Sequence, residues 1–407
     1  MLDSADGRDH DDGSKKKEKS RRPGNTAFRQ QRLKAWQPIL TPKTVLPLFF
    51  ILGVIFAPLG GLLLWASSKV EEIVINYTDC VENAPGGKAW NIQNFREIPS
   101  SDVQTSFRSG SPSKPRWQTV NQTIEGRTDP DRICTLEFEI PNNLPPPIFF
   151  YYRLTNFYQN HRRYVKSVDE RQLKGEAVSL GALKGSDACS PLIHDSETGK
   201  PYYPCGLIAN SLFNDTFSHP LWITTNNGLN NETYIMTDKG IAWESDRDRY
   251  KKSSYQNSDV MPPRNWRKNY PDGYTDKKPI PDLSQREDFQ VWMRTAGLPT
   301  FSKLARKNTT SPMLKGTYYV NITDNFNVKL YGGTKSIVIS TTTVMGGKNP
   351  FLGIAYVVVG GLCVVLGTIF AIRHLFKPRK LGDHTYLSWN NDQPSTATAS
   401  GREVRGE

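Results

Sequence analysis

The chain contains two long stretches of apolar residues, one toward each end. The first runs from Val45 to Ala66 and the second from Phe351 to Ile372, and neither contains a charged side chain. At about 1.5 Å of rise per helical residue, each stretch is long enough to cross a hydrocarbon core of roughly 30 Å. A buried helix of a soluble protein is the alternative, and two such stretches around a hydrophilic middle argue against it. The pattern predicts two membrane-spanning helices.

The first stretch is longer than the apolar core of a signal peptide and follows a long charged tail. Ala66, Ser67 and Ser68 resemble a cleavage site, but the length favours a retained signal anchor. The predicted order is a basic tail (1–44), a span (45–66), a large domain (67–350), a second span (351–372) and a second tail (373–407).

Short alternating patterns between the spans predict strands. Residues 134–140 place Leu136, Phe138 and Ile140 on one face. Residues 325–331 alternate in the same way and are followed by Gly-Gly-Thr and then by the apolar run 336–341. That arrangement predicts an antiparallel hairpin, with 318–322 as a neighbouring strand.

Two segments have helical periodicity. In the first, Ser284 and Glu287 have the spacing of a capping box, and Phe289, Trp292, Met293 and Ala296 then fall on one face. In the second, residues 151–167, one face holds Leu154, Phe157, Tyr158 and His161. We expect both faces to pack into a core. Residues 248–288 have little periodicity and predict a long surface excursion. The fold class is thus a mostly β domain with helical insertions between two spans.

The charge next to the spans predicts the orientation of the chain. Four basic residues precede the first span and four follow the second: Arg29, Arg32, Lys34, Lys43, Arg373, Lys377, Arg379 and Lys380. The inner flanks carry little net charge. Because positive flanks stay in the cytosol, both termini are predicted to be cytosolic and the domain lumenal or extracellular. The net charge is +12, and much of the clustered positive charge lies in the low-complexity segment 14–22, which argues against a folded nucleic-acid-binding face.

Cysteines and glycosylation sequons are consistent with an oxidising compartment. Four cysteines lie between the spans (Cys80, Cys134, Cys189 and Cys205), and Cys363 lies within the second span. Four cysteines allow three pairings, of which the sequential one is the simplest. A zinc site lacks the expected close spacing of ligands. All six sequons also lie between the spans, at Asn76, Asn121, Asn214, Asn231, Asn308 and Asn321.

The sequence contains no recognisable catalytic motif. It has no phosphate-binding loop, no GxSxG, no HExxH and no DKTG sequence of a phosphorylated pump. We therefore expect neither catalysis, nor a metal, nor a cofactor. Small residues instead repeat along the spans, at Gly53, Ala57 and Gly61 in the first and at Gly353, Gly360 and Gly367 in the second. Such stripes let another helix approach closely, so we expect both faces to contact a partner.

Five blocks of the sequence resemble the cell division control protein 50 family. They are FRQQRLKAWQPILTP (28–42), YYRLTNFYQNHRRYVKS (151–167), PCGLIANSLFNDT (204–216), DFQVWMRTAGLPTFSKLAR (288–306) and NPFLGIAYVVVGG (349–361). Their common order on a chain with two spans makes the resemblance specific.

The resemblance implies a non-catalytic subunit of a type IV P-type ATPase that moves phospholipid to the cytosolic leaflet. It implies an asymmetric β-sandwich, sequential disulfides Cys80–Cys134 and Cys189–Cys205, and a role in the ATPase's exit from the endoplasmic reticulum. The tail block adds a cytosolic contact, for which Phe28, Arg32 and Trp36 are the candidate residues. A subunit of a self-assembling two-span channel is the alternative, although these spans lack polar residues to line a pore.

Overall fold

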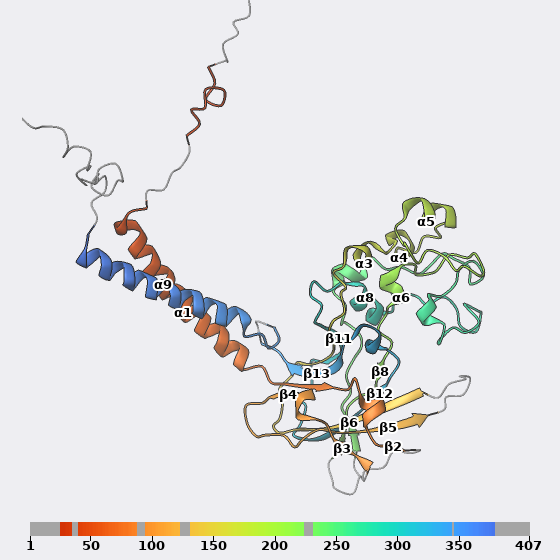
Figure 1. Cartoon of the computed structure of the whole chain (residues 1–407). Coiled ribbons are helices and arrows are strands. Elements are labelled where there is room, and N and C mark those ends of the chain that lie inside the picture. Colours follow the sequence, from red (N-terminus) through yellow and green to blue (C-terminus); the bar gives the residue numbers. More distant parts are fainter. Residues whose placement is uncertain are drawn as a thin grey trace, which may run out of the picture. The chain divides into compact units, whose positions relative to one another are not determined.

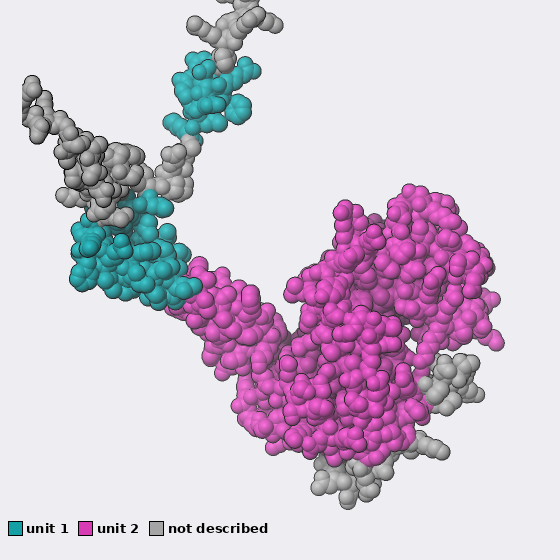
Figure 2. Space-filling view, in the orientation of Figure 1, with its two compact units in different colours: residues 1–55, 360–407 teal, residues 56–359 magenta. Residues whose placement is uncertain are grey.

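The structure, a computed structural model, describes residues 25–34, 40–87, 94–122, 131–223, 231–343 and 346–378. It divides into two compact units (Figure 2). One consists of Met1–Ile55 with Gly360–Glu407, and the other of Phe56–Val359. The boundary crosses both apolar helices, so each unit contains part of both.

The two apolar stretches form the two longest helices among the described residues (Figure 1). Helix α1 spans Pro42–Ser68 and α9 spans Phe351–Phe376, each a few residues longer than its apolar stretch. Only 11% of the most apolar window of either helix is buried within the chain. A core helix of a soluble protein would be mostly buried, so both helices are candidate membrane spans whose surfaces require lipid or another protein.

Glycines bring α1 and α9 into close contact in both units. In the first unit, a Cβ atom on Gly53 would lie 2.5 Å from Val364 Cγ2 and 3.2 Å from the Gly360 carbonyl oxygen. In the second, a Cβ on Gly60 would lie 2.8 Å from the Gly353 carbonyl oxygen. Real Cβ atoms essentially never lie within 3.0 Å of a backbone atom, as one on Gly60 would, so this close packing requires glycine there. We call this contact the glycine seam.

The seam changes the interpretation of the two predicted stripes. Gly353 lies against Leu64, and Gly367 lies against Phe49. Together with Gly360, they face the chain's own first span, so this face is covered from within the chain, and its contact with a partner stays a prediction. On α1, Gly53 also faces the seam, Ala57 is half-buried, and a Cβ on Gly61 would have no neighbour within 4 Å. Periodicity identified a shared face but not the helix that covers it.

The domain between the spans is built on two antiparallel sheets (Figure 1). The five-stranded sheet has the order β11-β7-β13-β1-β4. Its strands are β1 (Glu72–Asn76), β4 (Val103–Ser106), β7 (Ile148–Leu154), β11 (Phe301–Asn308) and β13 (Lys335–Thr341). Isoleucine and valine in β1 and β13 favour extended backbone, and both strands pair on both edges.

The second sheet has eight strands along the path β10-β9-β12-β6-β5-β2, with β3 beside β5 and β8 beside β12. Its long strands are β5 (Arg116–Gln122), β6 (Asp131–Ile140) and β12 (Gly316–Thr323). The short ones are β2 (Gly86–Gly87), β3 (Arg96–Glu97), β8 (Thr216–Phe217), β9 (Leu221–Ile223) and β10 (Asn231–Thr233). Among the strands that the structure describes, the β2–β5 pair alone is parallel.

Side chains from both sheets share one hydrophobic core. Ile337 and Phe150 of the first sheet belong to the same buried cluster as Leu136 and Val320 of the second. The rings of Phe150 and Phe217 lie 5.0 Å apart between the sheets. This arrangement is a β-sandwich, as the resemblance implied.

Short helices lie in the connections. They are α2 (Cys80–Asn83), α3 (Arg162–Lys166), α4 (Glu170–Leu173), α5 (Leu180–Ser186), α6 (Leu207–Asn210), α7 (Glu244–Arg247) and α8 (Glu287–Met293). Turns of 3-10 helix are η2 (Ser100–Asp102), η3 (Arg264–Trp266) and η4 (Val328–Tyr331). The irregular segment 248–288 contributes Tyr250, Trp266 and Leu283 to the core, so packing orders it.

Three local predictions were wrong, and a fourth was right only in part. Residues 151–154 belong to strand β7, in which alternate residues are buried, and a helix begins only at Arg162. The predicted hairpin is absent from this segment: residues 328–331 form η4, because the Asn327 side chain accepts a hydrogen bond from the Lys329 N–H and Gly332 ends the turn at φ 64°. Strand β12 exists as predicted, but it lies in the other sheet from β13.

The predicted capping box was the third. Ser284 donates its hydroxyl to Asp282, and α8 begins at Glu287 without a side-chain cap. The Glu287 carboxylate instead accepts hydrogen bonds from the N–H groups of Gly240, Ile241 and Ala242. Burial raises the pKa of Glu287, but these hydrogen bonds outweigh burial and hold its pKa below the ordinary value.

The junctions between domain and spans are held together directly. Strands β1 and β13 pair in register from Glu72↔Ser340 to Asn76↔Ser336. Beyond the ladder, the Thr341 N–H donates to the Glu71 carbonyl oxygen (2.9 Å), and the Asn349 N–H donates to Ser67 Oγ (3.1 Å). Two segments far apart in sequence therefore leave the domain side by side and continue into α1 and α9.

We expect Gly60→Leu to destabilise the pair of spans and Gly61→Leu to leave it intact. The first substitution places a side chain against the α9 backbone, whereas the second points into open space. Thermal unfolding of the full chain in detergent measures the difference. Equal melting temperatures for the two variants would contradict the seam.

Candidate functional site

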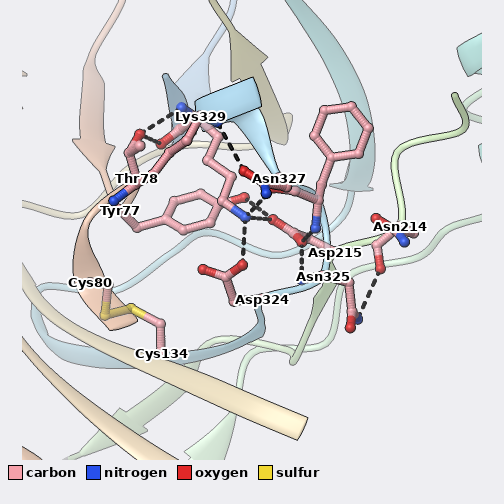
Figure 3. A network of polar contacts seen from close by, with 12 residues as sticks. Tyr77, Thr78, Cys80, Cys134, Asn214, Asp215, Asp324, Asn325, Asn327 and Lys329 are labelled. Carbon is pink, nitrogen blue, oxygen red and sulfur yellow. Dashed lines mark hydrogen bonds and ion pairs between the residues drawn. A yellow bond between two sulfur atoms is a disulfide. The ribbon is translucent and has the colours of Figure 1, made fainter. Parts of the chain in front are cut away.

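A buried ion cluster joins the two sheets beneath the surface of the domain. The Lys335 ammonium, at the start of β13, lies 2.7 Å from an Asp215 carboxylate oxygen and 2.9 Å from Asp324. It also donates to the Phe326 carbonyl oxygen at 2.8 Å. Figure 3 shows Asp215 and Asp324 converging on this cluster from different loops.

Asp215 is the acceptor that holds the cluster together. Besides Lys335, it accepts hydrogen bonds from the Tyr77 hydroxyl (2.9 Å) and from the N–H groups of Asn325 and Phe326 (2.6 Å each). Burial raises the pKa of Asp215, which means that its charge is costly, and Lys335 opposes that rise. The buried charges of Asp215, Asp324 and Lys335 therefore stabilise one another, and each depends on its oppositely charged partner.

Both disulfides of the sequential pairing are present. Cys80, at the start of α2, is bonded to Cys134 in β6 and so connects the segment after β1 to the second sheet (Figure 3). Cys189 is bonded to Cys205 within the helical insertions, where both contribute to a small second core with Leu183 and Tyr202.

Three loops meet over a cluster of aromatic rings. The Phe157 ring contacts those of Tyr164, Trp292, Phe301, Phe326 and Tyr331, with centroids 5.2–6.3 Å apart. These rings come from residues 155–164, from α8 and the strand after it, and from residues 326–331. Phe157, which sequence periodicity assigned to a helix, is thus the centre of the cluster.

Hydrogen bonds connect the same three loops. The Phe157 N–H donates to the Pro299 carbonyl oxygen (3.1 Å), and Asn160 Nδ2 donates to the Gly297 carbonyl oxygen (2.9 Å). Asn156, whose φ of 57° is left-handed, donates to the Tyr331 carbonyl oxygen (2.6 Å). We call residues 155–161, 294–299 and 327–333 the three-loop surface.

Large apolar side chains on the three-loop surface point into solvent. Tyr158 is 56% exposed, Leu298 is 69% exposed and Leu330 is 84% exposed. One is supplied by each loop, and the aromatic cluster fixes the loops beneath them. Exposed apolar residues on a rigid base are typical of protein-binding sites.

Lys303 has a lowered pKa, as reactive lysines do, but its contacts indicate a structural role. Burial lowers its pKa to about 7, and Arg294 adds to the effect. Its ammonium donates to the carbonyl oxygens of Val291, Trp292 and Arg294 at the end of α8. These are groups that a helix C-terminus leaves unpaired, so Lys303 acts as the cap of α8. Among the described residues, no group of His, Cys, Asp and Glu could hold a metal.

The remaining predicted site residues lie in separate places. Phe28 and Arg32 are exposed in a turn of the N-terminal segment, and Trp36 is outside the described residues. Among the sequons, Asn121, Asn231 and Asn321 are exposed, whereas Asn214 and Asn308 are half-exposed. Asn76 differs, because its Nδ2 donates to Asp102 and its oxygen accepts from the Thr78 hydroxyl. Sequence patterns did not predict the three-loop surface, since its exposed residues come from distant loops.

We expect Lys335→Met to lower the free energy of unfolding by about 3–5 kcal/mol, because Asp215 and Asp324 would lose their cation. Lys329→Met is the matched control. Lys329 pairs with Asp79 and Glu82 but is 43% exposed, so its loss should cost below about 1 kcal/mol. Urea unfolding of the full chain, followed by tryptophan fluorescence, distinguishes the two; similar small losses would contradict the role of the ion cluster.

Comparison with known proteins gives the family. The model of the LEM3 (ligand-effect modulator 3) family / CDC50 family matches residues 63–380. The chain is 44% identical to the phospholipid-transporting ATPase accessory subunit CDC50 of Chaetomium thermophilum, over 96% of this chain and 95% of that protein. It is 44% identical to the phospholipid-transporting ATPase accessory subunit CRF1 of Saccharomyces cerevisiae, over 95% of each. It is 39% identical to cell cycle control protein 50A of Bos taurus, over 88% of this chain and 91% of that protein. With this coverage and the two-span sandwich described above, the chain belongs to the LEM3/CDC50 family.

Proposed function

We propose that the chain is the non-catalytic accessory subunit of a phospholipid-transporting ATPase of the type IV P-type class. The observation that carries this proposal is the similarity along nearly the whole chain to relatives named as accessory subunits of such ATPases. The alternative of a two-span channel gains no support from these relatives.

In this role the domain contacts the loops of the ATPase on the outer side of the membrane through the three-loop surface. The exposed Tyr158, Leu298 and Leu330 support this assignment, since a partner would remove them from water. A partner helix packs against the faces of α1 and α9 beside the glycine seam, where Gly61 and Gly361 leave open space. Phe28, Arg32 and Trp36 add a cytosolic contact.

The subunit acts by binding the ATPase and catalyses no reaction itself. By binding the folded ATPase and not its unfolded chain, it stabilises the ATPase by mass action and promotes its exit from the endoplasmic reticulum. If its contacts differ between conformers of the ATPase, it also shifts the populations of these conformers during the transport cycle. In that cycle the ATPase moves phospholipid to the cytosolic leaflet.

The proposed topology places both termini in the cytosol and residues 67–350 in the lumen or outside the cell. The basic flanks of the two spans, two disulfides and six sequons in the intervening domain support it. The complex then resides in the endoplasmic reticulum, the Golgi or endosomes, or the plasma membrane.

We expect glycans at the exposed Asn121, Asn231 and Asn321 and none at Asn76. The Asn76 amide is half-buried and hydrogen-bonded to Asp102, so a glycan there would disrupt the end of β1. Peptide mass spectrometry after glycosidase treatment in heavy-oxygen water marks each occupied asparagine. A chain without any glycan would contradict the proposed topology.

The proposed function is tested by purifying the tagged full chain in mild detergent and identifying the co-purifying proteins by mass spectrometry. We expect a P-type ATPase with the wild type and about a tenfold lower recovery with Leu330→Glu, because a charge would be buried in the contact. Ile235→Glu is the matched control: Ile235 is 71% exposed but lies outside the three-loop surface.

The outcomes separate two claims. If the wild type recovers no ATPase, the proposed function is wrong. If Leu330→Glu and Ile235→Glu recover equal amounts of ATPase, the function stands but the three-loop surface is not the contact.

A further inference from the structure

A cavity of about 530 Å³ lies at the end of the helix pair where α1 begins and α9 ends. All of its lining residues belong to the unit of Met1–Ile55 and Gly360–Glu407. Val45, Leu46 and Phe370 form an apolar wall, and Arg373, His374 and Lys377 form a basic rim. Thr41 also lines the cavity.

The position of the cavity relative to the apolar stretches suggests its environment. Val45 is the first residue of the first apolar stretch, and Ile372 is the last residue of the second. The apolar wall thus lies within the hydrocarbon end of both spans, while the rim begins one residue beyond it. In a bilayer, the cavity would open where phospholipid headgroups join their acyl chains.

The charges of the rim lack partners within the described part of the chain. Arg373 and Lys377 lie one turn apart on the same face of α9, with the Lys377 N–H donating to the Arg373 carbonyl oxygen at 2.9 Å. No described carboxylate pairs with Arg373, His374 or Lys377, and none lines the cavity. Basic residues beside the spans account for the orientation of the chain in the membrane. They do not account for a cavity whose lining combines these cations with an apolar wall.

We propose that this cavity binds the phosphate headgroup of one anionic phospholipid, with the upper part of an acyl chain against Phe370 and Leu46. A guanidinium can contact two phosphate oxygens at once, and an ammonium adds a point charge. Basic pockets between spanning helices are suited to such headgroups. The cytosolic location of the site rests on the proposed topology, whereas binding itself does not require the ATPase.

Native mass spectrometry of the purified full chain tests the site. The chain is titrated with phosphatidic acid and, separately, with phosphatidylcholine of the same acyl chains. We expect the wild type to retain phosphatidic acid on the order of tenfold better than phosphatidylcholine. The double variant Arg373→Gln/Lys377→Gln should lose that preference while its melting temperature stays unchanged.

Arg29→Gln/Lys43→Gln is the matched control. It removes the same two residue types from the other basic flank, before the first span, at exposed positions outside the cavity. We expect it to bind phosphatidic acid like the wild type. Equal losses in the two double variants would mean general surface charge and would overturn the site, as would equal retention of phosphatidylcholine and phosphatidic acid by the wild type.

Inorganic phosphate distinguishes a lipid site from a simple anion site. Because the apolar wall contributes to lipid binding, a millimolar excess of phosphate should leave the bound phosphatidic acid in place. Displacement by free phosphate would contradict the proposal. Neither result depends on the ATPase, so the site and the proposed function can fail independently.

Discussion

The pairing of β1 with β13 is the contact on which the rest of the molecule depends. These strands lie inside the five-stranded sheet, and each continues into one of the two spans. Since the ladder brings together residues more than 250 positions apart, such as Glu72 and Ser340, it also sets where the chain leaves the domain. The hydrogen bonds of Glu71 and Ser67 extend this constraint to the helix ends. Because these hydrogen bonds connect the domain to the spans, binding of a partner to the domain can also affect the spans.

The buried charges and the aromatic rings act on either side of that ladder. Lys335 opens β13 and Tyr77 follows β1, so the ion cluster fixes the end of the ladder away from the spans. Through Asp324 and Phe326 it also positions the segment leading to η4, which carries Leu330. The exposed side chains of the three-loop surface therefore stand on contacts that reach back to the central strands. A partner would meet a preformed surface, which lowers the entropic cost of binding.

Sequence reasoning succeeded where the signal was local and long. Two uncharged stretches identified α1 and α9, and alternation identified β6 and β12. It failed where distant contacts decide: residues 151–154 pair with β13 and β11, which overrides a short helical period. The glycine stripes were visible, but the identity of the facing helix was not. Asp215 and Lys335 are 120 positions apart, and the only hint was a lysine directly before a buried apolar run.

The central claim is that this chain works as one fixed partner of a larger membrane protein. The mass of the complex purified in mild detergent, determined together with the identity of its chains, tests that claim most directly. We expect one copy of this 46.0 kDa chain with one copy of a much larger ATPase chain. An assembly that contains only copies of this chain would contradict it.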